Sequence, residues 1–173
     1  APGQNALSTA RKESDTVEIQ SGFFNGFTTG TPLCARIVNS DQHSKDYSIL
    51  ADKMRPGHAD YAGHVRYQGF NDYRGGGHFS GRLTAPLVFA GAVAKQALAQ
   101  YGIVVGSHIL QINYIKEERF NPMGVSDAEL AALHTKKFAV MNDAVGEKMQ
   151  ERILQAKSEL NSVGGVIEAI ALH

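Results

Sequence analysis

Two stretches of this sequence combine ionisable side chains with glycines at close spacing. The first is Arg55-Pro-Gly-His-Ala-Asp-Tyr61 and the second is Asp72-Tyr-Arg-Gly-Gly-Gly-His-Phe-Ser-Gly-Arg82. Three glycines in a row give up side-chain packing and gain backbone freedom. Because they stand beside charged groups, we expect the backbone there to approach a ligand closely.

The basic residues of these stretches indicate what kind of ligand this would be. Arg55, Arg74 and Arg82 can each form two parallel hydrogen bonds to a phosphate or carboxylate. The Ser80 hydroxyl and the backbone of Gly81 can donate to oxygens of the same anion. The pattern therefore favours an anionic ligand.

One residue of the first stretch can also move a proton. His58 is of the type that exchanges a proton near neutral pH, and Asp60 or Asp72 could orient it. A purely structural alternative stays open, in which arginine–aspartate pairs only hold a polar loop closed.

A metal site is a further alternative. His58, Asp60, His64, Asp72 and His78 are suitable ligand types. However, the sequence has no His-x-x-x-His or His-x-Glu pattern here, and three nearby arginines would repel a cation. We therefore expect no metal.

The elements on either side of these stretches can be predicted from sequence pattern. Residues 83–98 read as an apolar helix with Pro86 in its first turn, where a missing N–H costs nothing. The N-terminus of that helix would attract the same anion through its free N–H groups and its dipole. Since the helix is apolar nearly all round, we expect it to be buried between layers. Residues 55–82 read as mostly loop.

The rest of the chain reads as short strands and helices. Alternation at 17–20 and the Asn25-Gly26 pair predict an antiparallel hairpin over residues 16–39. A short helix is expected within 41–53, a strand at 104–115, and a capping box at Ser126–Glu129. His108, on that strand, is expected to be a structural histidine with its hydrogen bonds satisfied. This order of elements predicts an α+β fold.

Composition limits the broad class. The chain has 173 residues, 17 basic and 17 acidic side chains, one cysteine (Cys34) and 43% hydrophobic residues. Zero net charge gives no reason to expect nucleic acid or an anionic membrane as partner. A single cysteine suits a reducing cytosol, so we expect a cytoplasmic protein.

Because the motifs above occur in the same order along the chain, it resembles the chorismate synthase family. That family carries Arg-Pro-Gly-His-Ala-Asp-Tyr, then Asp-x-Arg-Gly-Gly-Gly-Arg-x-Ser-x-Arg-x-Thr and Ala-Gly-Ala-x-Ala-Lys. The matching positions are Arg55 to Tyr61, Asp72, Arg74 to Gly77, Ser80, Arg82, Thr84 and Ala90 to Lys95. The resemblance implies antiparallel sheets that sandwich a helical layer.

The resemblance also implies a reaction. Chorismate synthases remove phosphate and a ring proton from 5-enolpyruvylshikimate 3-phosphate, in an anti 1,4-elimination that gives chorismate. They need reduced FMN although there is no net redox change, and NADP is associated with the family. A cytoplasmic homotetramer is the implied assembly. The family's place is the shikimate pathway of aromatic amino acid biosynthesis.

Residue roles follow from the same resemblance. His58 matches the catalytic histidine that lies by the flavin. Substrate-phosphate arginines are matched by Arg55, Arg82 and Arg11. The flavin-contacting segment comprises His78, Phe79, Ser80, Gly81 and Arg82. The chain departs from the family at His78, where an arginine is usual.

Family members extend beyond both ends of this sequence. We therefore expect residues 1–173 to be one domain, the central part of a longer chain that lacks the Gly-Glu-Ser-His-Gly region and the C-terminal flavin-binding portion. Alone, this piece is expected to be inactive as a synthase. The alternative function is a non-catalytic module that binds an anion such as phosphate.

Overall fold

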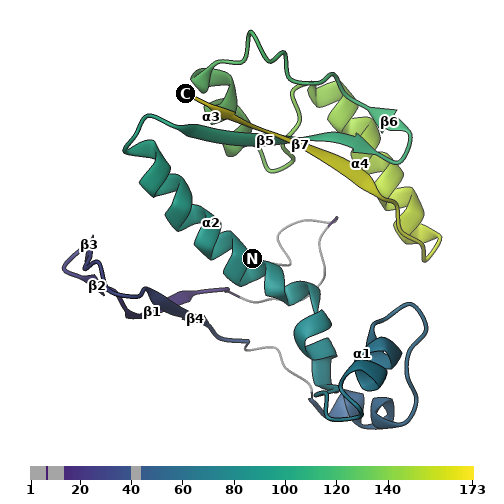
Figure 1. Ribbon diagram of the computed structural model, residues 1–173. Coiled ribbons are helices and arrows are strands. Elements are labelled where there is room, and N and C mark those ends of the chain that lie inside the picture. Colours follow the sequence, from purple (N-terminus) through teal and green to yellow (C-terminus); the bar gives the residue numbers. More distant parts are fainter. Residues whose placement is uncertain (1–6, 8–13, 40–43) are drawn as a thin grey trace. The chain divides into compact units, whose positions relative to one another are not determined.

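The computed structural model describes residue 7, residues 14–39 and residues 44–173. The chain divides into two compact units, with the boundary after Gly91. Both contain helices and antiparallel strands (Figure 1), so the predicted α+β class is confirmed. Among the described residues, no helix is long and apolar enough to cross a membrane.

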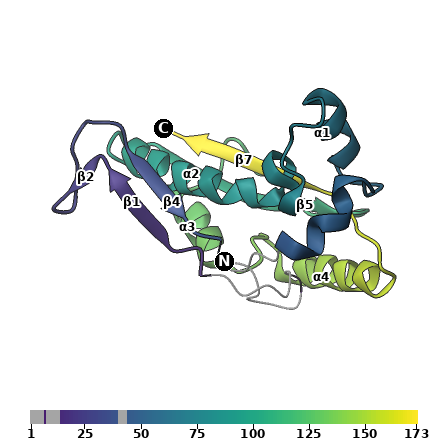
Figure 2. The same ribbon diagram turned by 90° about the horizontal axis from the view of Figure 1, so that it is seen from below.

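The first unit opens with the predicted hairpin. Strand β1 (Val17–Ser21) pairs antiparallel with β4 (Cys34–Ile37), and β2 (Phe23–Phe24) pairs with β3 (Phe27–Thr28). Figure 2 shows β1 and β4 side by side. Asn25 and Gly26 have φ of 49° and 86°, as a tight hairpin turn with two left-handed residues requires. The Asn-Gly signal therefore placed the turn correctly.

The segment expected to be mostly loop contains short helices. They are the α-helix α1 (Asp60–Arg66) and the 3₁₀ helices η2 (Arg74–Phe79) and η3 (Gly81–Leu83). Before this segment, the short helix expected within 41–53 is present as the 3₁₀ helix η1 (Ser44–Ala51). The loop prediction for 55–82 was thus wrong for most of its length. Glycines lower helix propensity, but single 3₁₀ turns tolerate them because they need few successive hydrogen bonds.

Helix α2 (Thr84–Ala99) follows and begins where it was predicted, with Pro86 in its first turn. None of its residues is buried, so the expectation of a buried helix was wrong for this chain. A helix that is apolar on all sides is expected to pack against other elements on several sides. The sequence of the helix does not show whether those elements belong to this chain.

The second unit is built on a three-stranded sheet. Its strand order is β6 (Ile115–Lys116), β5 (Val104–Ile112), β7 (Gly165–Leu172), with both pairs antiparallel. Helices α3 (Asp127–Thr135) and α4 (Asp143–Ser158) pack against β5. The predicted capping box is confirmed, because Ser126 and Glu129 each accept the other's backbone N–H.

The core of the second unit lies between this sheet and its helices. Phe120, Leu130 and Leu133 form a buried cluster, against which Val104, Val125, Ile170 and Leu172 pack. Gly106 permits the close approach of α3, since a Cβ there would lie 2.6 Å from a Leu130 methyl carbon. A larger residue at 106 would push α3 away from β5.

Candidate functional site

The first of the two chemical stretches is fixed by one ion pair. The Asp60 carboxylate accepts from Arg55 Nε at 2.8 Å, from Nη2 at 3.0 Å and from the Arg55 backbone N–H at 3.0 Å. Because Asp60 begins α1, the pair joins the Pro56-Gly57 turn to that helix. The guanidinium also lies 5.8 Å from the centre of the Tyr47 ring.

This pair leaves part of Arg55 available. Asp60 occupies the edge formed by Nε and Nη2, so Nη1 is directed elsewhere and can still donate to an anion. Hydrogen bonds from Arg55 lower the pKa of Asp60 to about 2, so the carboxylate stays ionised at neutral pH. The geometry can hold an arginine ready for a second, bidentate partner.

His58 lies between Arg55 and Asp60 in sequence, on the exposed surface of the turn. Its ring makes no hydrogen bond to another described side chain. Its charge contributes to lowering the pKa of Asp60, although the Arg55 hydrogen bond is the largest cause. An exposed imidazole at this position is accessible to a ligand and can exchange a proton with it.

The second stretch turns into helix α2 through Ser80. The Ser80 hydroxyl accepts from the backbone N–H of Arg82 at 3.2 Å and thereby caps η3. At the next turn, the Thr84 hydroxyl donates to the Gly81 carbonyl at 2.7 Å. These bonds fix the backbone on both sides of Arg82 at the helix entrance.

Arg82 reaches back to the hairpin. Its Nη2 donates to Asp15 Oδ1 at 2.9 Å and to the Val38 carbonyl at 3.3 Å. Both side chains of the pair are half-buried, at 23% and 21% exposure. An ion pair across 67 residues of sequence therefore anchors the Gly-rich segment to the start of β1.

The basic residues of the second stretch meet at a cavity of about 320 Å³. It lies at the N-terminal end of α2, within the first unit. Its lining residues are Ile37, Asn39, Arg74, Gly77, Ser80, Arg82, Leu83, Ala85 and Pro86. Two guanidinium groups, a hydroxyl and a helix N-terminus thus border one hollow, which is a suitable arrangement for an oxyanion.

A neighbouring cavity of about 260 Å³ takes in the other residues of the stretch. His78 and Phe79 line it together with Tyr67, Phe70, Asn71, Asp72 and Gly77. The Tyr67 and Phe79 ring centres are 6.3 Å apart. The Phe79 ring can pack closely against α1 because Gly63, on that helix, has no side chain to displace it. The lining fits a flat aromatic group with polar edges.

Arg74 has a second role besides lining the first cavity. Asp72 accepts from Arg74 Nε and Nη2, both at 2.8 Å, and from the Arg74 backbone N–H at 3.0 Å. These hydrogen bonds lower the pKa of Asp72 to about 2. The pair shapes the turn that leads into the glycine triplet.

The structure therefore groups the predicted site residues in three places. Ser80 and Arg82 share the first cavity, His78 and Phe79 line the second, and Arg55 and His58 lie in the α1 turn. Arg11 lies outside the described residues. Within the described part of the chain, no group of three or more His, Cys, Asp or Glu side chains is placed to hold a metal ion.

Sequence reasoning missed several residues of this region, among them Tyr67, Phe70 and Asn71 of the second cavity. Asp15, which pairs with Arg82, and Asn39, which lines the first cavity, are far from the chemical stretches in sequence. The only sequence signal is that each stands at an end of the predicted hairpin. Binding residues often lie on the loops that adjoin such ends.

Comparison with known proteins identifies the family to which this chain is similar. A family model described as chorismate synthase matches residues 1–173. A chorismate synthase from Pyrococcus abyssi is 43% identical over 171 residues, which are 99% of this chain and 46% of that protein. One from Aliarcobacter butzleri is 46% identical over 165 residues, 95% of this chain and 44% of that protein.

A solved structure agrees with the sequence matches. A crystal structure of chorismate synthase superimposes with a TM-score of 0.67 at 27% identity, covering 91% of this chain and 44% of that one. The chain thus spans about half the length of the relatives it matches. The family model covers all of the residues that build both cavities, and the chain belongs to the chorismate synthase family.

Proposed function

We propose that this chain supplies the central part of the active site of a chorismate synthase, which converts 5-enolpyruvylshikimate 3-phosphate to chorismate. The observation that carries the proposal is the cavity at the start of α2, where Arg74, Arg82 and Ser80 meet. A phosphate monoester carries two negative charges near neutral pH, and this is the group that two guanidinium ions and a helix N-terminus bind.

Each predicted residue takes a part in this proposal. Arg82 and Ser80 hold the substrate phosphate at the helix entrance. Arg55, oriented by Asp60, offers its remaining N–H groups to the same anion, and Arg11 is proposed as a further contact. His58, exposed beside Arg55, moves a proton at the flavin or the substrate.

Reduced FMN is the proposed cofactor. The aromatic cavity lined by Phe79, Tyr67 and Phe70 fits a flat ring system, with His78 and Asn71 at its polar edge. Ser80, Gly81 and Arg82 continue the chain from His78 and Phe79 and are proposed to contact the same flavin. When bound, reduced FMN supplies the transient electron that helps phosphate to leave. The residues of the protein bind and orient the substrate and the flavin, and they supply the proton.

Several features of the whole enzyme belong to the same proposal. A homotetramer, a cytoplasmic location and an association with NADP are proposed from family membership. Because relatives are about twice as long, we propose that residues 1–173 are the central part of a longer domain and lack synthase activity alone. Chorismate produced by the purified chain would contradict this last point.

The test is FMN binding to this chain, followed by quenching of flavin fluorescence with and without 5-enolpyruvylshikimate 3-phosphate. We expect saturable binding that tightens when substrate is present. His58→Ala and Arg82→Ala should each weaken it, roughly tenfold or more for Arg82, because a charged hydrogen bond contributes about 1.5–3 kcal/mol. Arg36→Ala is the matched control, since Arg36 pairs with Glu18 on the exposed hairpin.

The alternative function predicts a different result. A module that only binds anions would bind inorganic phosphate through Arg74 and Arg82, and its affinity would not depend on whether FMN is present or reduced. Phosphate binding without any effect of flavin would therefore favour the alternative over the synthase.

A further inference from the structure

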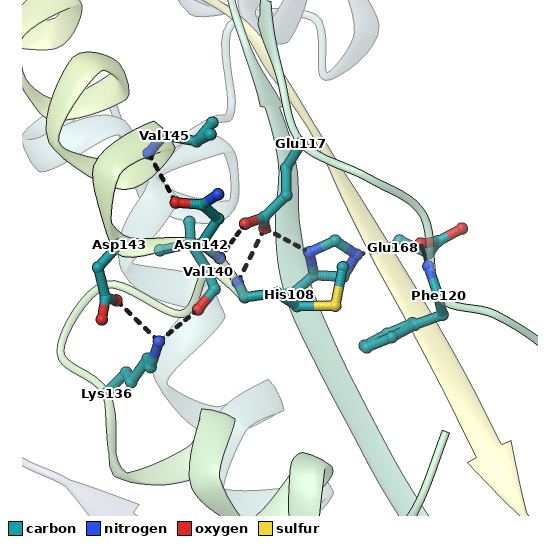
Figure 3. A network of polar contacts seen from close by, with 10 residues as sticks. His108, Glu117, Phe120, Lys136, Val140, Asn142, Asp143, Val145 and Glu168 are labelled. Atoms are coloured by element: carbon teal, nitrogen blue, oxygen red, sulfur yellow. Dashed lines mark hydrogen bonds and ion pairs between the residues drawn. The ribbon is translucent and has the colours of Figure 1, made fainter. Parts of the chain in front are cut away.

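A histidine in the second unit lies between two carboxylates. His108, on β5, is 1% exposed. Its Nδ1 lies 3.0 Å from Glu117 Oε2 and its Nε2 lies 3.0 Å from Glu168 Oε2. Figure 3 shows the imidazole ring between the two acids, with Glu117 after β6 and Glu168 on β7. The Glu117 side chain is 2% exposed and that of Glu168 is 17% exposed.

Other donors fix both carboxylates as acceptors. Glu117 accepts the backbone N–H of Met141 at 3.0 Å and that of Asn142 (Figure 3). Glu168 accepts the backbone N–H of Phe120 at 2.7 Å, and Arg119 Nη1 lies 3.4 Å from its other oxygen. A backbone amide can only donate. Four donors besides the histidine thus favour the ionised form of these two acids.

The number of hydrogens that these two contacts require indicates the protonation state of the His108 ring. Each nitrogen–oxygen contact needs one hydrogen between its two atoms, and a neutral imidazole carries only one N–H. A neutral His108 would leave a nitrogen lone pair facing a carboxylate oxygen in a buried site, which is costly. We infer that His108 is a buried imidazolium ion, so that His108, Glu117 and Glu168 together bind one proton more than a neutral histidine with two carboxylates.

This extra proton holds four segments together. They are β5, the segment from Glu117 to Phe120, the Met141–Asn142 entrance to α4, and β7. The Phe120 ring centre lies 4.4 Å from the imidazole centre, at 58° between planes, so the charged ring also lies against the apolar core. Without the proton, two negative charges would face a neutral ring, and the segments would separate to admit water.

The charged groups around the ring are consistent with this count. Glu117 contacts it from the segment after β6 and Glu168 contacts it from β7, while Arg119 contacts Glu168 on the outer side. Lys136 and Asp143 pair with one another at 2.7 Å behind the Met141–Asn142 turn and do not touch the ring. The hydrogen bond from His108 is the largest cause that lowers the pKa of Glu168.

The first test needs no substitution. Long-range ¹H–¹⁵N spectra of the uniformly labelled 173-residue chain at pH 7.5 distinguish a ring with two N–H groups from a ring with one. We expect His108 to show two protonated nitrogens, with the exposed His58 and His78 as references for rings in water. An unprotonated nitrogen on His108 at this pH would overturn the inference.

A second test follows the consequence for stability. The proton stabilises the folded unit at lower pH, and this stabilisation is lost as pH rises. We expect the urea midpoint of the unmodified chain to fall between pH 7 and pH 9. His108→Gln cannot bind the proton and should lose this dependence. His173→Gln is the matched control, because His173 pairs with Asp127 at an exposed position, and it should behave as the unmodified chain does. Equal slopes for His108→Gln and the unmodified chain would contradict the inference.

Discussion

The two units of the chain are stabilised by different interactions. The buried apolar residues among those described all lie in the second unit, where Leu110, Leu130 and Met149 are almost completely inaccessible to solvent. The first unit, which carries the candidate site, relies on carboxylate–guanidinium pairs. These are Arg36–Glu18, Arg55–Asp60, Arg74–Asp72 and Arg82–Asp15.

The difference teaches how the site keeps its geometry. Burial of apolar area supplies most of the free energy of folding, so the second unit has the larger source of stability. Directional ion pairs contribute little free energy at the surface, yet they fix the orientation of side chains. The first unit therefore has well-oriented arginines on a scaffold with little core of its own.

The largest effect is expected in the core of the second unit. Leu130→Ala removes a side chain with 0% exposure from the Phe120 and Leu133 cluster, so it should lower the free energy of unfolding by about 2–5 kcal/mol. Urea unfolding followed by far-UV circular dichroism measures this loss. Leu160→Ala, at a site 97% exposed, is the control and should change stability by less than about 0.5 kcal/mol. Similar losses for both variants would remove the distinction between core and surface.

The next effect concerns backbone geometry in the first unit. A Cβ at Gly22 would lie 2.6 Å from the Leu33 Cα, and Gly22 has φ of +80°. Gly22→Ala should therefore open the hairpin and cost more than the roughly 1–2 kcal/mol of a left-handed residue alone. Gly26→Ala is the matched control, because φ is +86° but nothing lies within 4 Å of the added carbon. Amide hydrogen exchange of β1 and β4 would show the difference, and equal protection in both variants would contradict it.

A smaller loss is expected at the start of α3. Ser126→Ala removes the hydroxyl that accepts from the Glu129 N–H at 3.3 Å and should cost about 1 kcal/mol. Ser126→Thr keeps a hydroxyl and should restore most of the stability. Thermal unfolding monitored by circular dichroism compares the three proteins. If threonine did no better than alanine, the loss would come from something other than capping.

The smallest effects separate two similar ion pairs of the first unit. Asp60 and Asp72 both have a pKa of about 2, lowered from 3.8 by an arginine. A lowered pKa stabilises the folded state above pH 3.8, and this stabilisation disappears as pH falls through about 2. The Asp60 side chain is 11% exposed and that of Asp72 is 54% exposed, so solvent screens the second pair more.

We therefore expect Asp60→Asn to lower the urea midpoint of the first unit at pH 6 and to have little effect at pH 2. Asp72→Asn should have little effect at either pH. Tyrosine fluorescence during urea titration at the two pH values provides the measurement. A larger effect from Asp72→Asn would mean that exposure does not decide the strength of these pairs.

Local signals in the sequence predicted much of the fold. The Asn25-Gly26 turn, the Ser126–Glu129 capping box and the position of Pro86 depend on residues close in sequence, and the structure confirms all three. His108 was expected to be a satisfied structural histidine, and its two hydrogen bonds agree with that. Its two acidic partners could not be predicted, since Glu168 is on a strand paired with β5 only in the folded chain.

Prediction failed in the segment from Arg55 to Arg82 and for one contact between residues that are distant in sequence. This segment was predicted to be mostly loop, but short helical turns form there beside the Arg55–Asp60 and Arg74–Asp72 pairs, whose partners are close in sequence. The Arg82–Asp15 pair joins segments that no periodicity connects. The residue types indicated an anion site, whereas the arrangement of two cavities is set only when the chain folds.

The order of strands in the second unit has a consequence for synthesis. Strand β5 pairs along its whole length with β7, so that Val104 lies opposite Leu172 and Ile112 opposite Gly165. A ribosome makes β5 long before β7, and closing so long a loop is slow compared with closing a hairpin. During that interval the edge of β5 that later pairs with β7 has no partner strand, which exposes the nascent chain to aggregation. Cells that make this protein should therefore depend on chaperones at that stage more for the second unit than for the locally paired hairpin of the first.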